Sequence, residues 1–551
     1  MVRFAIVFSL CSLVLQYNAQ FGRCQDALFQ MQTTAIAENH SPVAHWGWQP
    51  ENYTQWDTHS NRLIPVYTYG TRGYGAGVDL RSYDENNSLY RNAAKLADLY
   101  SQPPRDTLNP AANYLDQTDI YRLQLAASQA GKKYIFLFVF DGMDWQTTQA
   151  AATYNLGQVA YETGRGTGTW FQEYDASQTT QFSFMVTSPH NAGTKVNVDD
   201  QTVDNPGGTQ TGGYRASMGG NAPWAAATSL PYLAGEKEIA GPNHAYTDSA
   251  SSATSMMAGI KTYNAAINID PRGQKVETIA QQLQARGWSV GAVTSVPVSH
   301  ATPAASYAHN VHRSDYQDLT RDLLGLPSVT HPDRPLSGLD VLIGTGAGSE
   351  TQESSDQGAN FVPGNIYLTQ KDLEAIDVRN GGRYVVATRS KNQEGWESLR
   401  NAAATAVTQH QRLFGFFGVP STKHLPFETA NGDYLPATDN SKKSETYTSE
   451  DLKENPTLAQ MTEAAIQVLS TNPKGFWLLV EPGDVDWASH DNNLDNVIGA
   501  INSGDAAFRA VTEWVEKNSN WDESLIILTA DHGHLLNIDD LEALASMKKT
   551  R

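Results

Sequence analysis

Cysteine is nearly absent from this sequence, which contains two cysteines in 551 residues. Cys11 lies inside an apolar run near the N-terminus, so Cys24 alone would remain if that run were removed. A disulfide framework and a thiolate metal cluster are therefore both excluded. Any metal ion must be bound by histidine and carboxylate side chains.

Basic residues are also scarce, with 39 Lys and Arg against 59 Asp and Glu, a formal net charge of -20 and a sequence pI near 5.1. The basic residues form no stripe, which argues against a nucleic-acid partner or an anionic membrane surface. An anionic substrate is still allowed, because bound metal ions invert the local field. The hydrophobic fraction of 40% is ordinary for a globular protein of this length.

The apolar run at residues 4–15 is too short to span a membrane comfortably. It follows a basic N-terminus and has the length of a signal-peptide core, and Ala19 suits the last residue removed. We therefore expect a signal peptide at residues 1–19, no membrane span, and a secreted or periplasmic protein. A buried N-terminal helix is the alternative.

The rest of the chain alternates β-prone apolar runs with helical patterns and polar stretches. We expect residues 20–130 to be an N-terminal extension that packs on a main domain at residues 131–551. Long polar stretches at about residues 165–243 and 391–456 indicate loop insertions. Strands are predicted at residues 134–140, 289–293, 340–348, 383–389, 476–480 and 525–528.

A helix start is predicted within residues 244–259. Thr247, Asp248 and Ser249 are typical capping residues, and the small residues that follow favour a closely packed helix. A serine hydroxyl at a helix N-terminus suits phosphoryl chemistry, because the helix dipole favours a bound or attacking anion. A plain helix cap is the alternative.

Acidic residues and histidines follow three of the predicted strands. They are Asp141 after the first, then Glu481, Asp484, Asp486, His490 and Asp491, then Asp531, His532 and His534. Carboxylates with a few imidazoles are a suitable set for Zn²⁺ or Mg²⁺, although helix-capping or solvated acidic residues are the alternative. With Ser249, they place a nucleophile and metal ligands at one edge of one sheet.

On these residues the chain resembles the alkaline phosphatase family from about residue 134 to residue 534. The family's segments appear as Asp141-Gly142-Met143, Asp248 to Thr254, Ala301 to Ala305, Ala308 to Arg313, the spacing of Glu481, Asp486 and His490, and Thr529 to His532. The resemblance implies a three-layer α/β/α sandwich around one large, mostly parallel sheet. The resemblance also implies that the protein hydrolyses small phosphate monoesters and forms a homodimer.

The same resemblance implies a role for individual residues. Ser249 would form a phosphoserine, and Arg313 would clamp two phosphoryl oxygens, for which its planar fork is suited. Two Zn²⁺ ions and one Mg²⁺ ion would be bound. The expected ligands are Asp141, Asp531 and His532 for the zinc that ionises Ser249, Asp486 and His490 for the second zinc, and Asp141, Thr302 and Glu481 for magnesium.

The chain departs from the family's pattern in two ways. His300 and Trp487 stand where enterobacterial members carry Asp and Lys, which leaves the magnesium site and the pH optimum open. The family also has a histidine in an H-T-G segment some forty residues beyond the D-H pair, and residues 533–551 contain no such segment. We therefore expect a chain that lacks a C-terminal segment, with a loosely bound second zinc.

His534 either substitutes as a ligand of that zinc or donates a hydrogen bond to a ligating carboxylate. A truncated homologue that only binds metal and phosphate is the alternative to an active enzyme. A sulfatase is disfavoured because Ser249-Ala250-Ser251 lacks the C/S-x-P-x-R context, and related diesterases usually use threonine.

Overall fold

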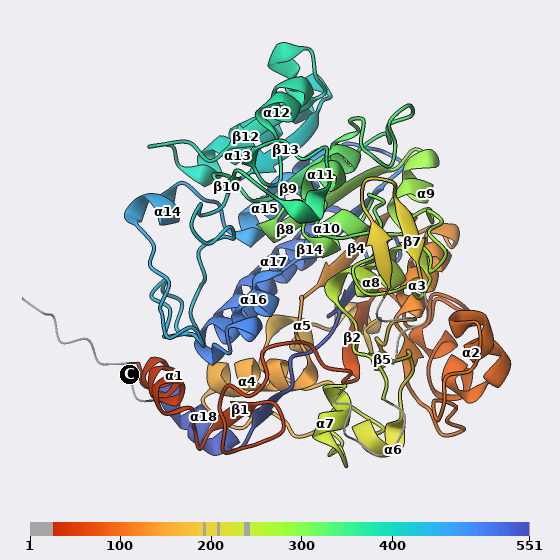
Figure 1. The fold of residues 1–551 in the computed structure, drawn as a ribbon, viewed down its shortest axis with the longest axis vertical. Coiled ribbons are helices and arrows are strands. Elements are labelled where there is room, and N and C mark those ends of the chain that lie inside the picture. The colour runs from red at the N-terminus through yellow and green to blue at the C-terminus, as the bar shows by residue number, and fades with distance from the viewer. Residues whose placement is uncertain (1–25, 191–193, 206–209, 236–242, 550–551) are drawn as a thin grey trace, which may run out of the picture.

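The computed structural model describes residues 26–190, 194–205, 210–235 and 243–549 (Figure 1). The predicted signal peptide lies outside these residues. Ten strands in the described part form one sheet. In spatial order they are β12 (Tyr384–Thr388), β13 (Arg412–Phe416), β9 (Val341–Thr345), β8 (Ser289–Pro297), β14 (Phe476–Glu481), β4 (Tyr134–Val139), β15 (Ser524–Thr529), β2 (Ile64–Tyr69), β5 (Gln181–Val186) and β3 (Leu115–Asp116).

The sheet is mostly parallel, as expected. The seven strands from β12 to β15 run parallel to one another, and β2 is antiparallel to both of its neighbours, β15 and β5. Three two-stranded pairs lie outside the large sheet: β1 (Ala44–Trp46) with β16 (Leu536–Ile538), β6 (Lys195–Asn197) with β7 (Thr202–Asp204), and β10 (Glu350–Thr351) with β11 (Gly364–Asn365).

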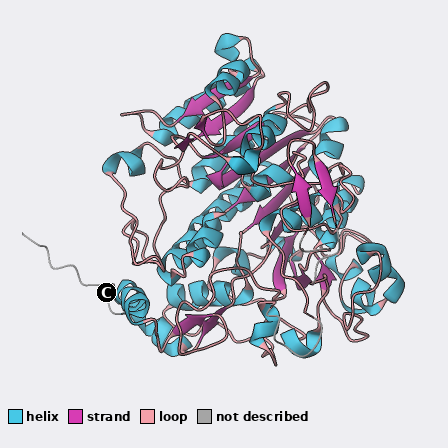
Figure 2. Cartoon of the chain, viewed as in Figure 1, coloured by secondary structure: helices cyan, strands magenta, loops and turns pink. Residues whose placement is uncertain are grey.

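Helices pack on the sheet in two groups (Figure 2). One group contains α4 (Trp145–Leu156), α13 (Gly395–Gln409), α15 (Leu458–Leu469), α16 (Asp484–His490) and α17 (Leu494–Asn518). The other contains α3 (Thr118–Gln129), α8 (Ser249–Ala258), α9 (Ile279–Ala285), α10 (Ala301–Ala305) and α11 (Tyr316–Leu324). Near the two ends of the described chain, α1 (Ala27–Glu38) contacts α18 (Leu541–Lys549).

The remaining helices are short. The α-helices are α2 (Ala93–Tyr100), α5 (Trp170–Glu173), α6 (Ala216–Gly219), α7 (Leu230–Leu233), α12 (Gln370–Ile376) and α14 (Ser449–Lys453). The 3₁₀ helices are η1 (Leu80–Ser82), η2 (Glu85–Asn87), η3 (Leu89–Arg91), η4 (Ala176–Gln178), η5 (Ser355–Gln357) and η6 (Val378–Asn380).

Alternating side chains of the central strands show that the two groups of helices cover opposite faces. In β14, the ring of Phe476 packs against Trp514 of α17, with centroids 5.5 Å apart. The next residue, Trp477, donates a hydrogen bond of 2.7 Å to Gln124 of α3. Successive strand residues point to opposite faces, so helices lie on both sides of the sheet. The chain therefore forms the expected three-layer sandwich.

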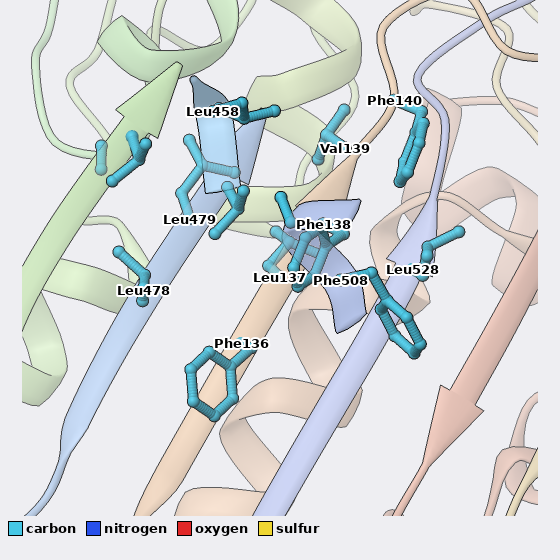
Figure 3. Packing of buried hydrophobic residues seen from close by; sticks show 14 of the residues in the cluster. Phe136, Leu137, Phe138, Val139, Phe140, Leu458, Leu478, Leu479, Phe508 and Leu528 are labelled. Atoms are coloured by element: carbon cyan, nitrogen blue, oxygen red, sulfur yellow. The ribbon is translucent and has the colours of Figure 1, made fainter. Parts of the chain in front are cut away.

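Large apolar side chains fill the space between the sheet and α17 (Figure 3). Phe136 and Phe138 of β4 contact Trp514 and Phe508 of α17, and all of the residues of β14 are buried. Burying one such side chain stabilises the folded state by about 1.5–3 kcal/mol. Burial on both faces explains why these strands are continuous apolar runs.

Four strands of the sheet lie in segments for which we expected no part in it. β2 and β3 come from residues 20–130, so this region is built into the sheet instead of packing over it as an extension. β5 and β13 come from the two expected loop insertions. Each of these strands is two to six residues long and lies among turn-forming residues. Such short segments show no long periodic pattern, so the sequence did not predict them.

Candidate active site

Four neighbouring parallel strands, β8, β14, β4 and β15, end at the same edge of the sheet. Asp141 follows β4, Glu481 ends β14, and Asp486 lies in the helix after it. Asp531 and His532 follow β15. Each of these five side chains is at most 3% exposed. The topology therefore collects at one buried position five of the residues that the sequence predicted as metal ligands.

Ser249 is the first residue of α8, as the capping pattern predicts. Asp248 caps the helix by accepting a 3.0 Å hydrogen bond from the backbone N–H of Ser251, and Gly259 ends it in the left-handed conformation. Ser249 is 1% exposed and borders a pocket of about 290 Å³. The pocket is lined by His59, Ser249, His300, Arg313, Asp486, Trp487, His490 and Asp491.

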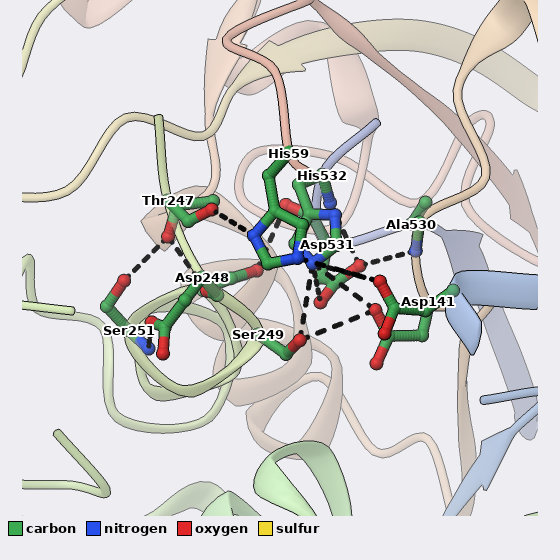
Figure 4. A network of polar contacts seen from close by, with 12 residues as sticks. His59, Asp141, Thr247, Asp248, Ser249, Ser251, Ala530, Asp531 and His532 are labelled. Carbon is green, nitrogen blue, oxygen red and sulfur yellow. Dashed lines mark hydrogen bonds and ion pairs between the residues drawn. The ribbon is translucent and has the colours of Figure 1, made fainter. Parts of the chain in front are cut away.

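Ser249 and three predicted ligands form a compact group of oxygen and nitrogen atoms (Figure 4). Nε2 of His532 lies 3.3 Å from Oδ1 of Asp141, 3.2 Å from Oδ2 of Asp531 and 3.2 Å from Oγ of Ser249. Oγ of Ser249 is 3.5 Å from Oδ1 of Asp141. Tetrahedral zinc with bonds of about 2.0–2.2 Å holds its ligand atoms about 3.3–3.6 Å apart. These four residues fit one Zn²⁺.

Backbone groups orient Asp531 toward this group. Its Oδ1 accepts hydrogen bonds of 2.9 Å from the N–H groups of Gly142 and His532, and Oδ2 is buried without a hydrogen-bond partner in the described part of the chain. Gly142 has a φ of +75°, and a Cβ there would lie 2.8 Å from the ring of His534. The glycine after Asp141 is therefore required by both backbone conformation and space.

A second group surrounds Asp486. His490 lies one turn further along α16, with its Nε2 3.4 Å from Oδ1 of Asp486. Nε2 of His534 is 2.7 Å from the same oxygen, which is a hydrogen-bond distance. Nε2 of His59 is 3.6 Å from this oxygen and 3.2 Å from Nε2 of His490. The second group thus contains three histidines and one carboxylate.

His59 is a site residue that we did not single out from the sequence. It lies shortly before β2, and its ring stacks on the ring of His532 with centroids 3.6 Å apart (Figure 4). The available signal was the Thr58-His59-Ser60 segment ahead of an apolar, β-prone run. That signal is weak, because a lone histidine before a strand is usually structural.

A third group shares Asp141 with the first. Asp141, Glu481 and His300 bring ligand atoms within 4.8 Å of one another. Thr294 donates a hydrogen bond to Glu481, and Thr302 is fully buried in α10 beside it. Carboxylates and a threonine hydroxyl suit Mg²⁺, whereas the imidazole of His300 adds a ligand that favours zinc or another transition metal.

The electrostatics of the site follow from placing several carboxylates in one buried volume. Burial raises the pKa of Asp141 well above its usual range, that of Glu481 to about 8 and that of Asp531 to about 6, and negative neighbours add to the effect. Burial acts in the same direction on Asp486, but its interactions with the neighbouring histidines, His490, His534 and His59, together outweigh burial and hold that pKa well below its usual range. Cations would relieve the repulsion among these groups.

Arg313 supplies positive charge to the lining of the pocket. It donates a hydrogen bond of 3.1 Å to Oδ2 of Asp248, and its other terminal nitrogen lies 3.2 Å from Nε2 of His300. Trp487 packs edge-on against His300, with ring centroids 5.7 Å apart. The guanidinium therefore borders the same pocket as Ser249, and its fork geometry suits phosphate.

Comparisons with known proteins agree on one family. Residues 214–546 match the family model described as Alkaline phosphatase. The chain is 29% identical over 294 residues to Alkaline phosphatase 4 of Bacillus subtilis (strain 168), covering 53% of this chain and 50% of that protein. It is 30% identical over 303 residues to Alkaline phosphatase of Escherichia coli (strain K12), covering 53% and 59%. The chain thus spans about half to three fifths of these relatives.

Two solved structures are also similar. One is a cold-active alkaline phosphatase from the psychrophile Shewanella sp., with 21% identity, a TM-score of 0.42, and coverage of 73% of this chain and 68% of that chain. The other is an alkaline phosphatase from the Antarctic bacterium TAB5, with 20% identity, a TM-score of 0.41, and coverage of 73% and 80%.

Proposed function

This chain belongs to the alkaline phosphatase family, and on that premise we propose that it hydrolyses phosphate monoesters through a phosphoserine intermediate on Ser249. The main support is the position of the Ser249 hydroxyl, 3.2 Å from His532 and 3.5 Å from Asp141, at the start of a helix. A buried serine among potential metal ligands is arranged for activation as a nucleophile. Arg313 at the same pocket supplies a phosphate-binding group.

Under this proposal, two Zn²⁺ ions and one Mg²⁺ ion bind in the three groups. The first zinc is held by Asp141, Asp531 and His532, the second by Asp486 and His490, and magnesium by Asp141, Thr302 and Glu481. When bound, such ions lower the pKa of the serine hydroxyl and of a water molecule and neutralise charge on the phosphoryl oxygens.

The protein's own residues bind the phosphoryl group and supply the nucleophile. Arg313 holds two non-bridging phosphoryl oxygens, and the N-terminus of α8 favours the anion. Oγ of Ser249 attacks phosphorus, so the Oγ–P bond forms while the P–O bond to the alcohol breaks and the alcohol leaves with a proton. Water then attacks phosphorus, the Oγ–P bond breaks, Ser249 regains a proton, and inorganic phosphate is released.

Hydrolysis of p-nitrophenyl phosphate by the full chain at alkaline pH, with Zn²⁺ and Mg²⁺ present, tests the proposal. p-Nitrophenyl sulfate and bis(p-nitrophenyl) phosphate serve as matched substrates, and we expect much slower turnover of both. A protein that binds zinc and phosphate but hydrolyses none of the three would be a binding homologue, and the proposed activity would be wrong.

We also propose that the protein is exported and forms a homodimer. Export rests on the signal-peptide pattern of residues 1–19, and dimerisation rests on family resemblance alone. None of the described helices combines the length and apolar character needed to cross a bilayer. Protein sequencing of the N-terminus of the exported protein and light scattering of the purified chain test these two points.

A further inference from the structure

The rings of His59 and His490 face each other through their Nε2 atoms, which are 3.2 Å apart. Nδ1 of His59 lies 3.0 Å from the carbonyl oxygen of Thr247, and Nδ1 of His490 contacts the carbonyl oxygen of Asp57. A carbonyl oxygen only accepts, so each Nδ1 carries a proton. In the neutral rings, two Nε2 lone pairs therefore point at each other, an arrangement that a cation between them stabilises.

The three distances among His59, His490 and Asp486 match those among ligands of one ion. They are 3.2 Å between the two Nε2 atoms, 3.4 Å from His490 to Oδ1 of Asp486, and 3.6 Å from His59 to that oxygen. The edge of a tetrahedron of zinc ligands is about 3.3–3.6 Å. All three side chains border the pocket, which leaves the fourth position open, as in a catalytic zinc site.

His534 has a different relation to the same carboxylate. Its Nε2 lies 2.7 Å from Oδ1 of Asp486, shorter than the separation of two ligands of one zinc ion. Its side chain is fully buried, and it does not line the pocket. This geometry is that of a hydrogen bond that orients a ligating carboxylate.

We propose that His59 is the third protein ligand of the metal ion bound by Asp486 and His490, and that His534 orients Asp486. His59 precedes β2, the strand that is antiparallel to β15. Metal binding thereby joins the N-terminal part of the chain to α16. The inference rests on the proposed function only for the identity of the metal as zinc.

Zinc binding by the full-length variants His59→Ala and His534→Ala tests this assignment. Exposed His40, in the same N-terminal region, provides the control variant His40→Ala. With His59 as a third ligand, the second zinc is no longer expected to bind loosely, as the sequence alone suggested. We expect wild type and His40→Ala to bind two zinc ions tightly, and His59→Ala to bind one of them at least tenfold more weakly. With Co²⁺ in place of zinc, the visible absorption spectrum should change in His59→Ala and stay similar in His534→Ala.

Thermal unfolding separates loss of a ligand from loss of folding. In chelator, His59→Ala should unfold near the wild-type temperature, and zinc should raise that temperature less than it does in wild type. Unchanged zinc affinity and cobalt spectrum in His59→Ala would overturn the proposal and leave a histidine–histidine hydrogen bond. Loss of the ion in His534→Ala alone would assign that residue instead, and a wild type that binds no zinc would also refute it.

These measurements do not depend on turnover. A wild type that binds two zinc ions but hydrolyses no phosphate ester would contradict the proposed function, while the comparison of His59→Ala with wild type would still decide the ligand.

Discussion

Arg313 donates a hydrogen bond to Asp248, the residue that caps the helix beginning with Ser249. The same carboxylate accepts from the backbone N–H groups of Ser251 and Ala265. Asp248 thus fixes two things at once, the start of α8 and the direction of the guanidinium. One side chain therefore sets the positions of both the proposed nucleophile, Ser249, and the proposed phosphate-binding group, Arg313.

Arg313→Ala should weaken inhibition by inorganic phosphate and lower kcat/KM together. A charge-assisted hydrogen bond contributes about 1.5–3 kcal/mol, which corresponds to a loss of roughly 10- to 150-fold in each quantity. Steady-state kinetics with and without phosphate provide the measurement. Arg313→Lys is the matched control. We expect it to restore the positive charge of the side chain but not the bidentate contact with phosphate. Unchanged phosphate inhibition in Arg313→Ala would refute the role.

Ser249→Ala should abolish covalent phosphorylation and leave phosphate binding largely intact. The reason is that Asp248, and not Ser249, caps α8, so the helix start should survive the change. Labelling with radioactive phosphate at acid pH, followed by peptide mapping, gives the measurement. A Ser249→Ala protein that is still labelled would show that another residue is the nucleophile.

In the metal-free protein, Glu481 should lower the free energy of unfolding as pH rises from 7 to 8.5. The folded pKa of Glu481 is about 8, above its ordinary range, so the folded state binds more protons than the unfolded state in this window. The contribution of this group is therefore present at low pH and lost as pH rises through 8. Burial lowers the pKa of Lys132 to about 7, and this group and the histidines with lowered pKa act in the opposite direction, so comparison with Glu481→Gln isolates the contribution of Glu481.

Thermal unfolding in chelator at the two pH values measures this effect. Glu481→Gln should show a flatter dependence on pH, and added Zn²⁺ and Mg²⁺ should reverse the slope in wild type, because cations favour the ionised carboxylates. A Glu481→Gln protein with the same dependence on pH as wild type would contradict the buried-carboxylate account.

Asp495→Asn should stabilise the protein more at pH 8.5 than at pH 5. Asp495 lies in α17, is 1% exposed, and accepts a hydrogen bond of 3.0 Å from the N–H of Ala430 through Oδ1. Burial raises its pKa from the ordinary 3.8 to about 7, so this group lowers stability progressively between these two pH values, and the full cost is present above pH 7. A neutral amide avoids roughly 2–4 kcal/mol of this cost. Denaturant unfolding at both pH values measures it, and equal effects would exclude ionisation as the cause.

The sequence predicted those parts of the structure that depend on interactions between residues close together in the chain. The start of α8 follows from capping chemistry, and the strands before Asp141, Glu481 and Asp531 follow from apolar runs that must be buried on both faces. His59 could not be found in this way, because its partner His490 lies 431 residues away in sequence. No local pattern encodes that β2 inserts beside β15, since this depends on pairing across the whole sheet.

His534 illustrates the same limit at short range. Its position two residues after His532 indicated a place near the site, and both a ligand and a hydrogen-bond partner were consistent with that spacing. Only the separation of 2.7 Å from Asp486 distinguishes the two roles, because spacing along the chain does not determine distances between side-chain atoms.

The place of β2 between β15 and β5 sets an order of events during synthesis. β2 can pair with β5 early, but its other edge stays unpaired until β15 has been synthesised. The hydroxyl of Thr529 donates a hydrogen bond to the carbonyl oxygen of Pro65, and these two residues are 464 positions apart in the sequence. At 5–20 residues per second, the ribosome needs roughly 20 to 90 s to make that interval. An unpaired edge bearing the apolar residues of β2 is prone to aggregate meanwhile. The nascent chain should therefore depend on chaperones until β15 emerges.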